Sequence, residues 1–336
     1  MQIGENNTDN KIFIIAEIGN NHEGSFDVAC ELIKSAAQAG ADAVKFQSIV
    51  PDKLVSKKDL DRMKQLKKFS FSRKQFEDLS LIAKKNGVLF MSTPFDLESV
   101  DWLNPLVPAY KIASGDNDFF PLLDRVAMTG KPAIVSMGLG GIKHIKELIN
   151  FFRSAWEKYG FKDPGVGLLH CVVSYPTPLD QADLRTIERL KVPGVTVGYS
   201  DHTIGIKAAE IAVAAGARII EKHFTLDKNF SSFRDHQLSA DPYEFGVMVK
   251  SIKDADALLG YNLDSIKDAE KSNEFSARRS IAAAHDIAAS EVVEWEDLVW
   301  IRPRIGMKPG EEHMICGKRL TKPIAGGEAF TLAHFE

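Results

Sequence analysis

The chain of 336 residues has few cysteines, and those it has are not arranged for pairing. Cys30, Cys171 and Cys316 are far apart, form no CxxC pair and are odd in number. A small secreted protein held together by disulfides has an even and closely spaced set. The sequence therefore argues against a disulfide framework and favours a reducing compartment, so we expect a cytoplasmic protein.

Long apolar runs and a strong excess of one charge are also missing. No run approaches the roughly 20 apolar residues that cross a bilayer, and the first residues, MQIGENNTDNK, lack the basic-then-apolar pattern of a secretion signal. The formal net charge of −4 gives no general attraction to nucleic acid or to an anionic membrane. We expect neither of these partners.

Short apolar runs rich in Val, Ile and Ala alternate with segments of helical period. In residues 26–40, for example, Ala29, Leu32, Ile33 and Ala36 fall on one helical face. Eight runs are candidate strands: 11–17, 41–47, 87–92, 109–114, 132–137, 166–171, 194–200 and 217–223. Eight strands with a helix after each are typical of a (β/α)8 TIM barrel, an α/β fold, which we favour over a doubly wound open sheet.

The composition changes after the eighth helix. We predict a barrel domain over 1–259, a polar linker over 260–277 and a small β-rich domain over 278–336. Within the last domain, 286–298 aligns with 323–335, which indicates an internal pseudo-repeat. Chance similarity is the alternative over so short a stretch.

Polar side chains gather where the predicted strands end. In a TIM barrel the carboxyl ends of the strands meet at one mouth, where the active sites of such enzymes lie. The polar residues at these positions are Glu17, Lys45, Gln47, Thr93, Lys111, Ser114, Asp116, Ser136, His170, Tyr175, Ser200, His202, Glu221, Lys222 and His223. Their shared position predicts an active site.

Two histidines and two lysines suggest the chemistry of this site. His202 and His223 end consecutive strands, so they either bind a divalent metal or are hydrogen-bonded residues of the rim, and spacing alone leaves both open. Lys45 and Lys111 can hold a carboxylate or phosphate. The alternatives are that each lysine pairs with an acid inside the barrel, or that one forms a Schiff base as in aldolases.

A series of motifs resembles one enzyme family. In order along the chain they are IAEIGNNHEGS (15–25), VKFQ (44–47), STPF (92–95), YKIASGD (110–116), LLHC…YPTP (168–178), GYSDHT (198–203) and EKHFTLD (221–227). Together they resemble the sialic acid synthase family, transferases that make nonulosonic acids from phosphoenolpyruvate and an N-acetylated aminosugar. RRS (278–280) and WIRPRIGMKPGE (300–311) resemble that family's C-terminal antifreeze-like (SAF) domain.

The resemblance implies ligands for most of the polar positions. It implies a divalent metal, usually Mn²⁺ with Mg²⁺ or Co²⁺ as alternatives, held by His202 and His223. It implies that phosphoenolpyruvate is bound by Lys45, Thr93, Lys111, Ser114, Ser136 and Ser200, and that the aminosugar contacts Glu17, Gln47, Tyr175 and Asp235. Arg302 matches an arginine that reaches the sugar from a partner subunit, which implies a domain-swapped homodimer.

The reaction implied by the resemblance is a condensation. C3 of phosphoenolpyruvate attacks the aldehyde of the open-chain sugar, water adds at C2, and phosphate leaves through C–O cleavage. The metal polarises the aldehyde, the lysines stabilise the phosphate, and Glu17 is a candidate for taking a proton from the water. A lyase that works through a Schiff base and a catalytically weak sugar-binding protein are the alternatives.

Several positions depart from the family's pattern, mostly on the sugar side. Asp116 stands where Glu is common, and Val173 stands where N-acetylneuraminate synthases carry Asn. SSFRD (231–235) replaces a PGPD-like turn, and the segment after Gln47 is shorter. We therefore expect an intact condensation site with an altered acceptor pocket, which leaves N-acetylmannosamine and 2,4-diacetamido-trideoxyhexoses both open as acceptors.

Overall fold

The computed structural model of the chain describes residues 1–260 and 265–335. The chain divides into two compact units, Met1–Gly260 and Tyr261–Glu336. The part of the predicted linker at 261–264 lies outside the described residues.

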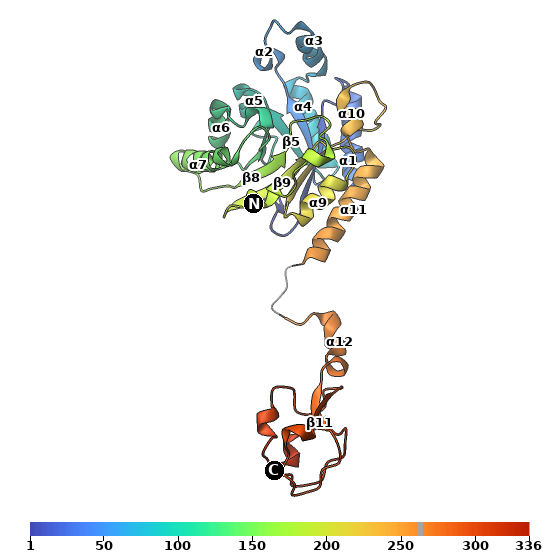
Figure 1. The fold of residues 1–336 in the computed structure, drawn as a ribbon. Coiled ribbons are helices and arrows are strands. Elements are labelled where there is room, and N and C mark those ends of the chain that lie inside the picture. Colours follow the sequence, from blue (N-terminus) through green and yellow to red (C-terminus); the bar gives the residue numbers. More distant parts are fainter. Residues whose placement is uncertain (261–264, 336) are drawn as a thin grey trace. The chain divides into compact units, whose positions relative to one another are not determined.

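The first unit is a barrel of parallel strands surrounded by helices (Figure 1). Its eight-stranded sheet has the order β5-β4-β3-β10-β9-β8-β7-β6, and the end strands β5 and β6 lie against each other. The strands are β3 (Phe13–Gly19), β4 (Ala43–Ser48), β5 (Leu89–Pro94), β6 (Tyr110–Ile112), β7 (Ala133–Ser136), β8 (Val166–Cys171), β9 (Val195–Asp201) and β10 (Ile219–His223). The predicted (β/α)8 barrel is confirmed.

Apolar side chains fill both faces of the strands. Phe13, Ile15, Leu169 and Ile219 belong to a buried cluster that lines the barrel interior, and the alternate side chains pack against the helices. An N-terminal hairpin, β1 (Gln2–Ile3) with β2 (Asn6–Asn7), adds Ile3 to the interior cluster. The sequence did not predict this hairpin.

The helices of the first unit include one per barrel crossover and several additions. They are α1 (Phe26–Gln38), α2 (Pro51–Leu54), α3 (Leu60–Phe69), α4 (Arg73–Lys85), α5 (Leu97–Leu103), α6 (Phe120–Ala127), α7 (Ile142–Lys158), α8 (Thr186–Arg189), α9 (Lys207–Ala214), α10 (Arg234–Leu238) and α11 (Pro242–Leu259). Figure 1 shows α2 and α3 at the end of the barrel opposite the N-terminus. These two helices therefore lie at the mouth, where the carboxyl ends of the strands meet.

Helix α1 illustrates how local sequence determines these elements. Ser25 caps its start by accepting a hydrogen bond from the backbone N–H of Val28. The apolar stripe that the sequence predicted is the buried face. Gly40 follows with a φ of 93°, a left-handed conformation that suits glycine and ends the helix.

The second unit is small and contains a two-stranded antiparallel sheet, β11 (Ser280–Ala283) with β12 (Leu298–Ile301). Helix α12 (Asp268–Ala277) lies within the predicted linker, and none of its residues is buried. The two copies of the pseudo-repeat pair with each other through Ile287 and Ile324. Each copy also carries a short 3-10 helix at the equivalent place, Trp295–Asp297 and Leu332–His334.

Candidate active site

A cavity of about 370 Å³ lies at the carboxyl ends of the barrel strands. The inward-facing row of each strand turns from apolar to polar there, as in Ile219, Glu221 and His223 of β10. Most of the residues that the sequence placed in the site line this cavity: Glu17, Lys45, Gln47, Thr93, Lys111, Ser114, Asp116, Ser136, Tyr175, Ser200, His202, Glu221, His223 and Asp235. His170 and Lys222 do not line it, because His170 lies against the Ala182 carbonyl and Lys222 is buried in an ion pair with Asp201. Arg302 is an exposed residue of the second unit.

Two buried lysines share one carboxylate in the cavity wall. Lys45 Nζ lies 3.6 Å from Oε2 of Glu221, and Lys111 Nζ lies 3.5 Å from its Oε1. Lys45 also lies 2.6 Å from Oε2 of Glu17. The lysines therefore do pair with acids inside the barrel. This pairing is compatible with anion binding, because an incoming anion can share the ammonium groups with the carboxylates.

Three hydroxyl groups surround the ion pairs. Lys45 donates to Thr93 Oγ1 at 3.3 Å, and Lys111 donates to Ser136 Oγ at 2.7 Å. Ser200 Oγ donates to Oε1 of Glu221 at 2.9 Å. Ammonium and hydroxyl donors converge here in a buried place, which is an arrangement suited to a carboxylate or phosphate ligand.

Burial and pairing set the protonation of this cluster. Burial lowers the pKa of Lys111, and the charge of Glu221 opposes this only in part. Burial also opposes the charge on Lys45, but Glu17 and Glu221 outweigh it and raise the pKa of Lys45. Glu221 stays ionised because the two lysines overcome burial and lower its pKa to about 2. Burial raises the pKa of Glu17 against the attraction of Lys45, which suits a group that exchanges a proton.

His202 and His223 lie next to each other, with ring centroids 5.4 Å apart, and the Tyr175 ring lies 4.1 Å from that of His202. Nδ1 of His202 lies 2.9 Å from the carbonyl oxygen of Val172. A carbonyl only accepts, so Nδ1 carries a proton, and Nε2 is the nitrogen that the neutral ring would offer to a metal. Nδ1 of His223 is buried and has no hydrogen-bond partner in the described structure.

This pair of imidazoles fits a divalent metal that takes further ligands from substrate and water. Burial, helped by nearby cations, holds the pKa of His223 well below its usual value, so the ring is neutral as metal binding requires. Among residues 1–260 and 265–335, no group of three or more His, Cys, Asp or Glu side chains forms a complete metal cage.

Polar groups next to the lysine cluster suit a sugar. Gln47 donates to Oε1 of Glu17 at 2.9 Å, and Asn20 donates to Gln47 at 3.0 Å. Oδ1 of Asp235 is buried without a hydrogen bond, although it forms a 3.3 Å ion pair with Nε of Arg234. Burial raises the pKa of Asp235, with Arg234 opposing. A sugar hydroxyl can donate a hydrogen bond to this acceptor.

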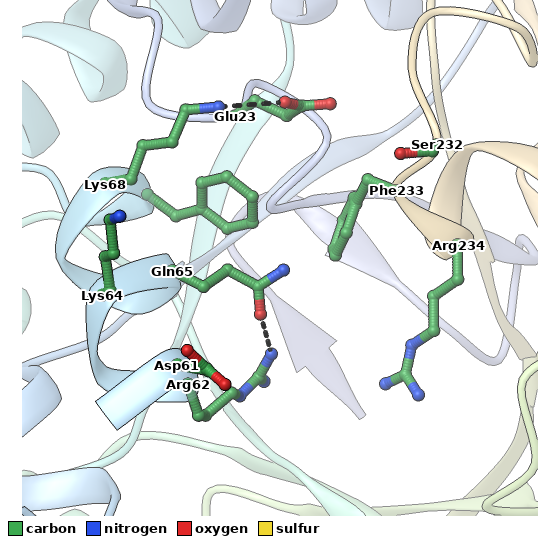
Figure 2. A pocket seen from close by; sticks show the side chains of 10 residues that line it. Glu23, Asp61, Arg62, Lys64, Gln65, Lys68, Ser232, Phe233 and Arg234 are labelled. Carbon is green, nitrogen blue, oxygen red and sulfur yellow. Dashed lines mark hydrogen bonds and ion pairs between the residues drawn. The ribbon is translucent and has the colours of Figure 1, made fainter. Parts of the chain in front are cut away.

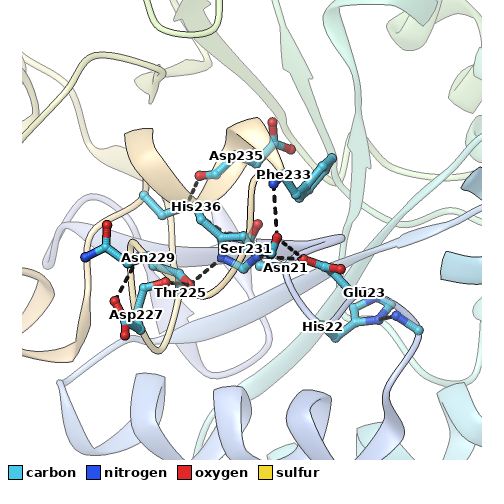
Figure 3. A network of polar contacts seen from close by, with 12 residues as sticks. Asn21, His22, Glu23, Thr225, Asp227, Asn229, Ser231, Phe233, Asp235 and His236 are labelled. Atoms are coloured by element: carbon cyan, nitrogen blue, oxygen red, sulfur yellow. Dashed lines mark hydrogen bonds and ion pairs between the residues drawn. The ribbon is translucent and has the colours of Figure 1, made fainter.

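A polar network holds the segment that carries Asp235 (Figure 3). Asn21, from the turn after β3, donates to Ser239 Oγ at 2.9 Å. Glu23 of the same turn accepts a hydrogen bond from Ser231, and its Oε1 lies 3.3 Å from Nε2 of His236. Residues far apart in the sequence therefore fix one wall of the cavity.

Comparisons with known proteins assign the family. The NeuB family profile matches residues 32–264. The chain belongs to the NeuB family. It is 37% identical to N,N'-diacetyllegionaminic acid synthase of Campylobacter jejuni, over 93% of this chain and 96% of that protein. It is 36% identical to a pseudaminic acid synthase of Campylobacter jejuni, with 100% of both chains covered.

A solved structure agrees with this assignment. N-acetylneuraminic acid synthetase from Leptospira borgpetersenii, in complex with citrate, superposes with a TM-score of 0.74 at 33% identity, over 81% of this chain and 94% of that chain. The resemblance to sialic acid synthases that the motifs indicated is confirmed.

This NeuB-family cavity also contains residues to which sequence reasoning gave no role. Glu221 is the most central of them, and the signal was available, because strand alternation places it on the same face as His223. Arg62 and Arg234 were missed because α3 and α10 lie outside the regular barrel pattern. Asn20 was part of a quoted motif without an assigned contact.

Proposed function

We propose that the chain condenses phosphoenolpyruvate with the open-chain aldehyde of an N-acetylated aminosugar, giving a nonulosonic acid and phosphate. The observation that carries this proposal is one cavity in which a histidine pair adjoins a cluster of lysines and hydroxyls. The histidine pair suits a metal on an aldehyde oxygen, and the cluster suits a phosphorylated carboxylate. The product class follows the names of the two Campylobacter relatives.

The lysine cluster would bind and polarise phosphoenolpyruvate. Lys45 and Lys111 would face its phosphate and carboxylate, with hydroxyl donors from Thr93, Ser114, Ser136 and Ser200. Glu221 keeps both lysines in place through its two oxygens. As C–O cleavage releases phosphate, the lysines neutralise the growing charge on the leaving group. Glu17 would take the proton of the water that adds at C2.

The acceptor would lie next to the lysine cluster. A divalent metal, Mn²⁺ in our proposal and bound by His202 and His223, supplies Lewis-acid polarisation of the aldehyde when present. Gln47 and Tyr175 would contact the sugar, and Oδ1 of Asp235, which lacks a hydrogen bond in the described structure, would accept one from a sugar hydroxyl. C3 of phosphoenolpyruvate would then bond to the aldehyde carbon.

The test is phosphate release from phosphoenolpyruvate with Mn²⁺, with and without chelator. The acceptor panel contains N-acetylmannosamine, its 6-phosphate and the 2,4-diacetamido-trideoxyhexoses. Chelator-sensitive release that depends on one sugar is the expected result. If protein that binds Mn²⁺ and phosphoenolpyruvate releases no phosphate with any of the sugars, the proposal is contradicted. That result would favour a sugar-binding protein without this activity.

One observation favours a second function. Burial lowers the pKa of Lys111, which is a property of lysines that form Schiff bases. A lyase of this kind is trapped by borohydride in the presence of pyruvate, as a covalent adduct on the Lys111 peptide. We expect no adduct, since Ser136 and Glu221 engage this ammonium group. An adduct would replace the condensation proposal.

We further propose a homodimer in which Arg302 reaches the barrel of the partner subunit. Its exposure in the second unit leaves its guanidinium available, and the SAF-like motif WIRPRIGMKPGE contains it. Replacing Arg302 with Ala should raise KM for the sugar about tenfold, the size of one charge-assisted contact, with little change in KM for phosphoenolpyruvate. Steady-state kinetics measures both.

A matched control and a mixing experiment sharpen this prediction. Lys318→Ala removes another exposed cation of the second unit and should leave both KM values unchanged. Hybrids of an Arg302→Ala chain with a His223→Ala chain should show the wild-type KM for the sugar, because a swapped dimer then contains one intact site. Hybrids whose active sites all keep the raised sugar KM of the Arg302→Ala parent would contradict the swap.

The pH dependence of kcat/KM for phosphoenolpyruvate should reflect the ionisation of Asp116. Burial, helped by the charge of Asp118, raises the pKa of Asp116 to about 6. Below that pH the carboxyl is neutral, and above it a negative charge faces the cavity that would hold anionic phosphoenolpyruvate. We therefore expect kcat/KM for phosphoenolpyruvate to fall as pH rises through about 6. The same profile of Asp116→Asn should lack this fall, and identical profiles would exclude Asp116 as its cause.

We propose that the protein works in the cytoplasm. Cys30, Cys171 and Cys316 are all free thiols, which fits a reducing compartment. Within residues 1–260 and 265–335, none of the helices has the length and apolar character of a membrane span.

A further inference from the structure

A second and larger cavity adjoins the candidate active site. It has a volume of about 1080 Å³ and lies between α3 and residues 232–234. Arg62, Phe233 and Arg234 line both cavities, so a ligand in one can extend into the other. Figure 2 shows side chains of α3 on one side of this cavity and Phe233 and Arg234 on the other. We call it the α3 cavity.

The wall of the α3 cavity carries more positive than negative charge. Its charged residues are four cations, Arg62, Lys64, Lys68 and Arg234, and two acids, Glu23 and Asp61. Glu23 is already engaged, because it lies 3.3 Å from Lys68 Nζ and accepts a hydrogen bond from Ser231. Burial opposes ionisation of Glu23, but these contacts and His236 lower its pKa. Arg62 donates a hydrogen bond to the neutral amide of Gln65 at 2.6 Å.

The apolar part of the wall strengthens the attraction between these cations and a bound anion. The rings of Phe69 and Phe233 meet edge to face with centroids 5.3 Å apart. Phe69 is buried. An apolar surface beside the cations excludes water from one side of a bound anion, and lower water content strengthens each ion pair.

Two of the departures from the family's pattern contribute to this wall. The SSFRD turn supplies Phe233 and Arg234, and the shortened segment after Gln47 contains α3 with Arg62 and Lys64. Two separate changes that meet at one cavity indicate that this is where the acceptor differs.

We propose that the α3 cavity binds a phosphate monoester on the acceptor sugar, at the end remote from the aldehyde. This inference rests on the proposed function, which puts the aldehyde beside His202 and His223. Arg62 and Arg234 supply planar guanidinium groups that bind two phosphate oxygens at once, and Lys64 and Lys68 add charge. The acceptor class is thus a phosphorylated aminosugar.

The experiment compares a sugar with and without phosphate. Calorimetry and steady-state kinetics use N-acetylmannosamine and N-acetylmannosamine 6-phosphate, with wild-type protein, the double variant Arg62→Gln/Lys64→Gln, and Lys67→Gln as a control. Lys67 is an exposed lysine of α3 outside the cavity wall. In wild-type protein and in the control, we expect the phosphate to lower Kd and KM at least about tenfold. In the double variant this ratio should fall to near one.

Three outcomes would overturn the inference. The first is equal binding of the two sugars by wild-type protein, or binding of neither. The second is a phosphate preference that the double variant retains. The third is binding of inorganic phosphate as tight as that of the phosphorylated sugar, which would assign the cavity to free phosphate. Condensation with a neutral sugar alone would leave the proposed function standing and reject only this inference, because binding is measured separately from turnover.

Discussion

Replacing His223 with alanine is expected to lower metal-dependent kcat/KM by about a thousandfold, because several kcal/mol of Lewis-acid stabilisation are lost with the metal. Nδ1 of His223 is a buried nitrogen without a hydrogen bond in the described structure, which fits the proposed role of this ring as a metal ligand. One imidazole, that of His202, would remain. A single histidine holds a divalent ion far more weakly than two.

The measurement that tests this assignment is Mn²⁺ binding to metal-free protein, followed by electron paramagnetic resonance. His223→Ala should raise the Kd for Mn²⁺ at least about tenfold, the lower range for loss of a supporting contact. His285→Ala removes an exposed histidine of the second unit and should change nothing. Binding of phosphoenolpyruvate should persist in both variants, since the lysine cluster is untouched. Wild-type Mn²⁺ affinity in His223→Ala would refute the metal site.

The barrel and the composition of its mouth were predictable because both depend on short-range patterns. Alternation along each strand gave the elements, and parallel strands bring their carboxyl ends together whatever the helices contain. Lys45 and Lys111 could therefore be placed in one site from sequence. Their common partner Glu221 could not be identified as such, because the contact depends on how three different strands converge.

The acceptor side was predicted less well, for a physical reason. Its wall comes from α3, α10 and the turn after β3, which are joined by side-chain hydrogen bonds rather than by strand geometry. Sequence reasoning noted the departure at Val173, yet Val173 is not among the residues that line either cavity in the described part of the chain. Arg62 carried no pattern that distinguishes it from other surface cations.

A buried ion pair stands directly before the two proposed metal ligands. Asp201 precedes His202, Lys222 precedes His223, and the two residues are register partners in β9 and β10. Nζ of Lys222 lies 3.0 Å from Asp201 Oδ2, with both side chains 0% exposed, and donates to the Thr203 carbonyl at 2.6 Å. Asp201 Oδ1 accepts from the N–H and the hydroxyl of Thr203, each at 2.8 Å. These contacts fix the backbone on both sides of His202.

Replacing Lys222 with methionine should therefore destabilise the barrel by about 3–5 kcal/mol, because it leaves a buried carboxylate without its cation. Urea unfolding measures the loss of stability. Following the unfolding by hydrogen exchange of peptides from β9 and β10 restricts the measurement to the first unit. The control is Lys228→Met, whose pair with Glu244 is partly exposed at 27% and 32% and should be worth less than about 1 kcal/mol.

The double variant Asp201→Asn/Lys222→Met distinguishes the effect of the ion pair on stability from its effect on the proposed metal site. It removes the unpaired carboxylate, so it should recover part of the stability that Lys222→Met loses. It should still bind Mn²⁺ more weakly than wild-type protein if the pair sets the separation of the histidines. Wild-type Mn²⁺ affinity in this variant would limit the pair to a structural role. A loss of stability in Lys222→Met no larger than in Lys228→Met would show that burial adds nothing to this interaction.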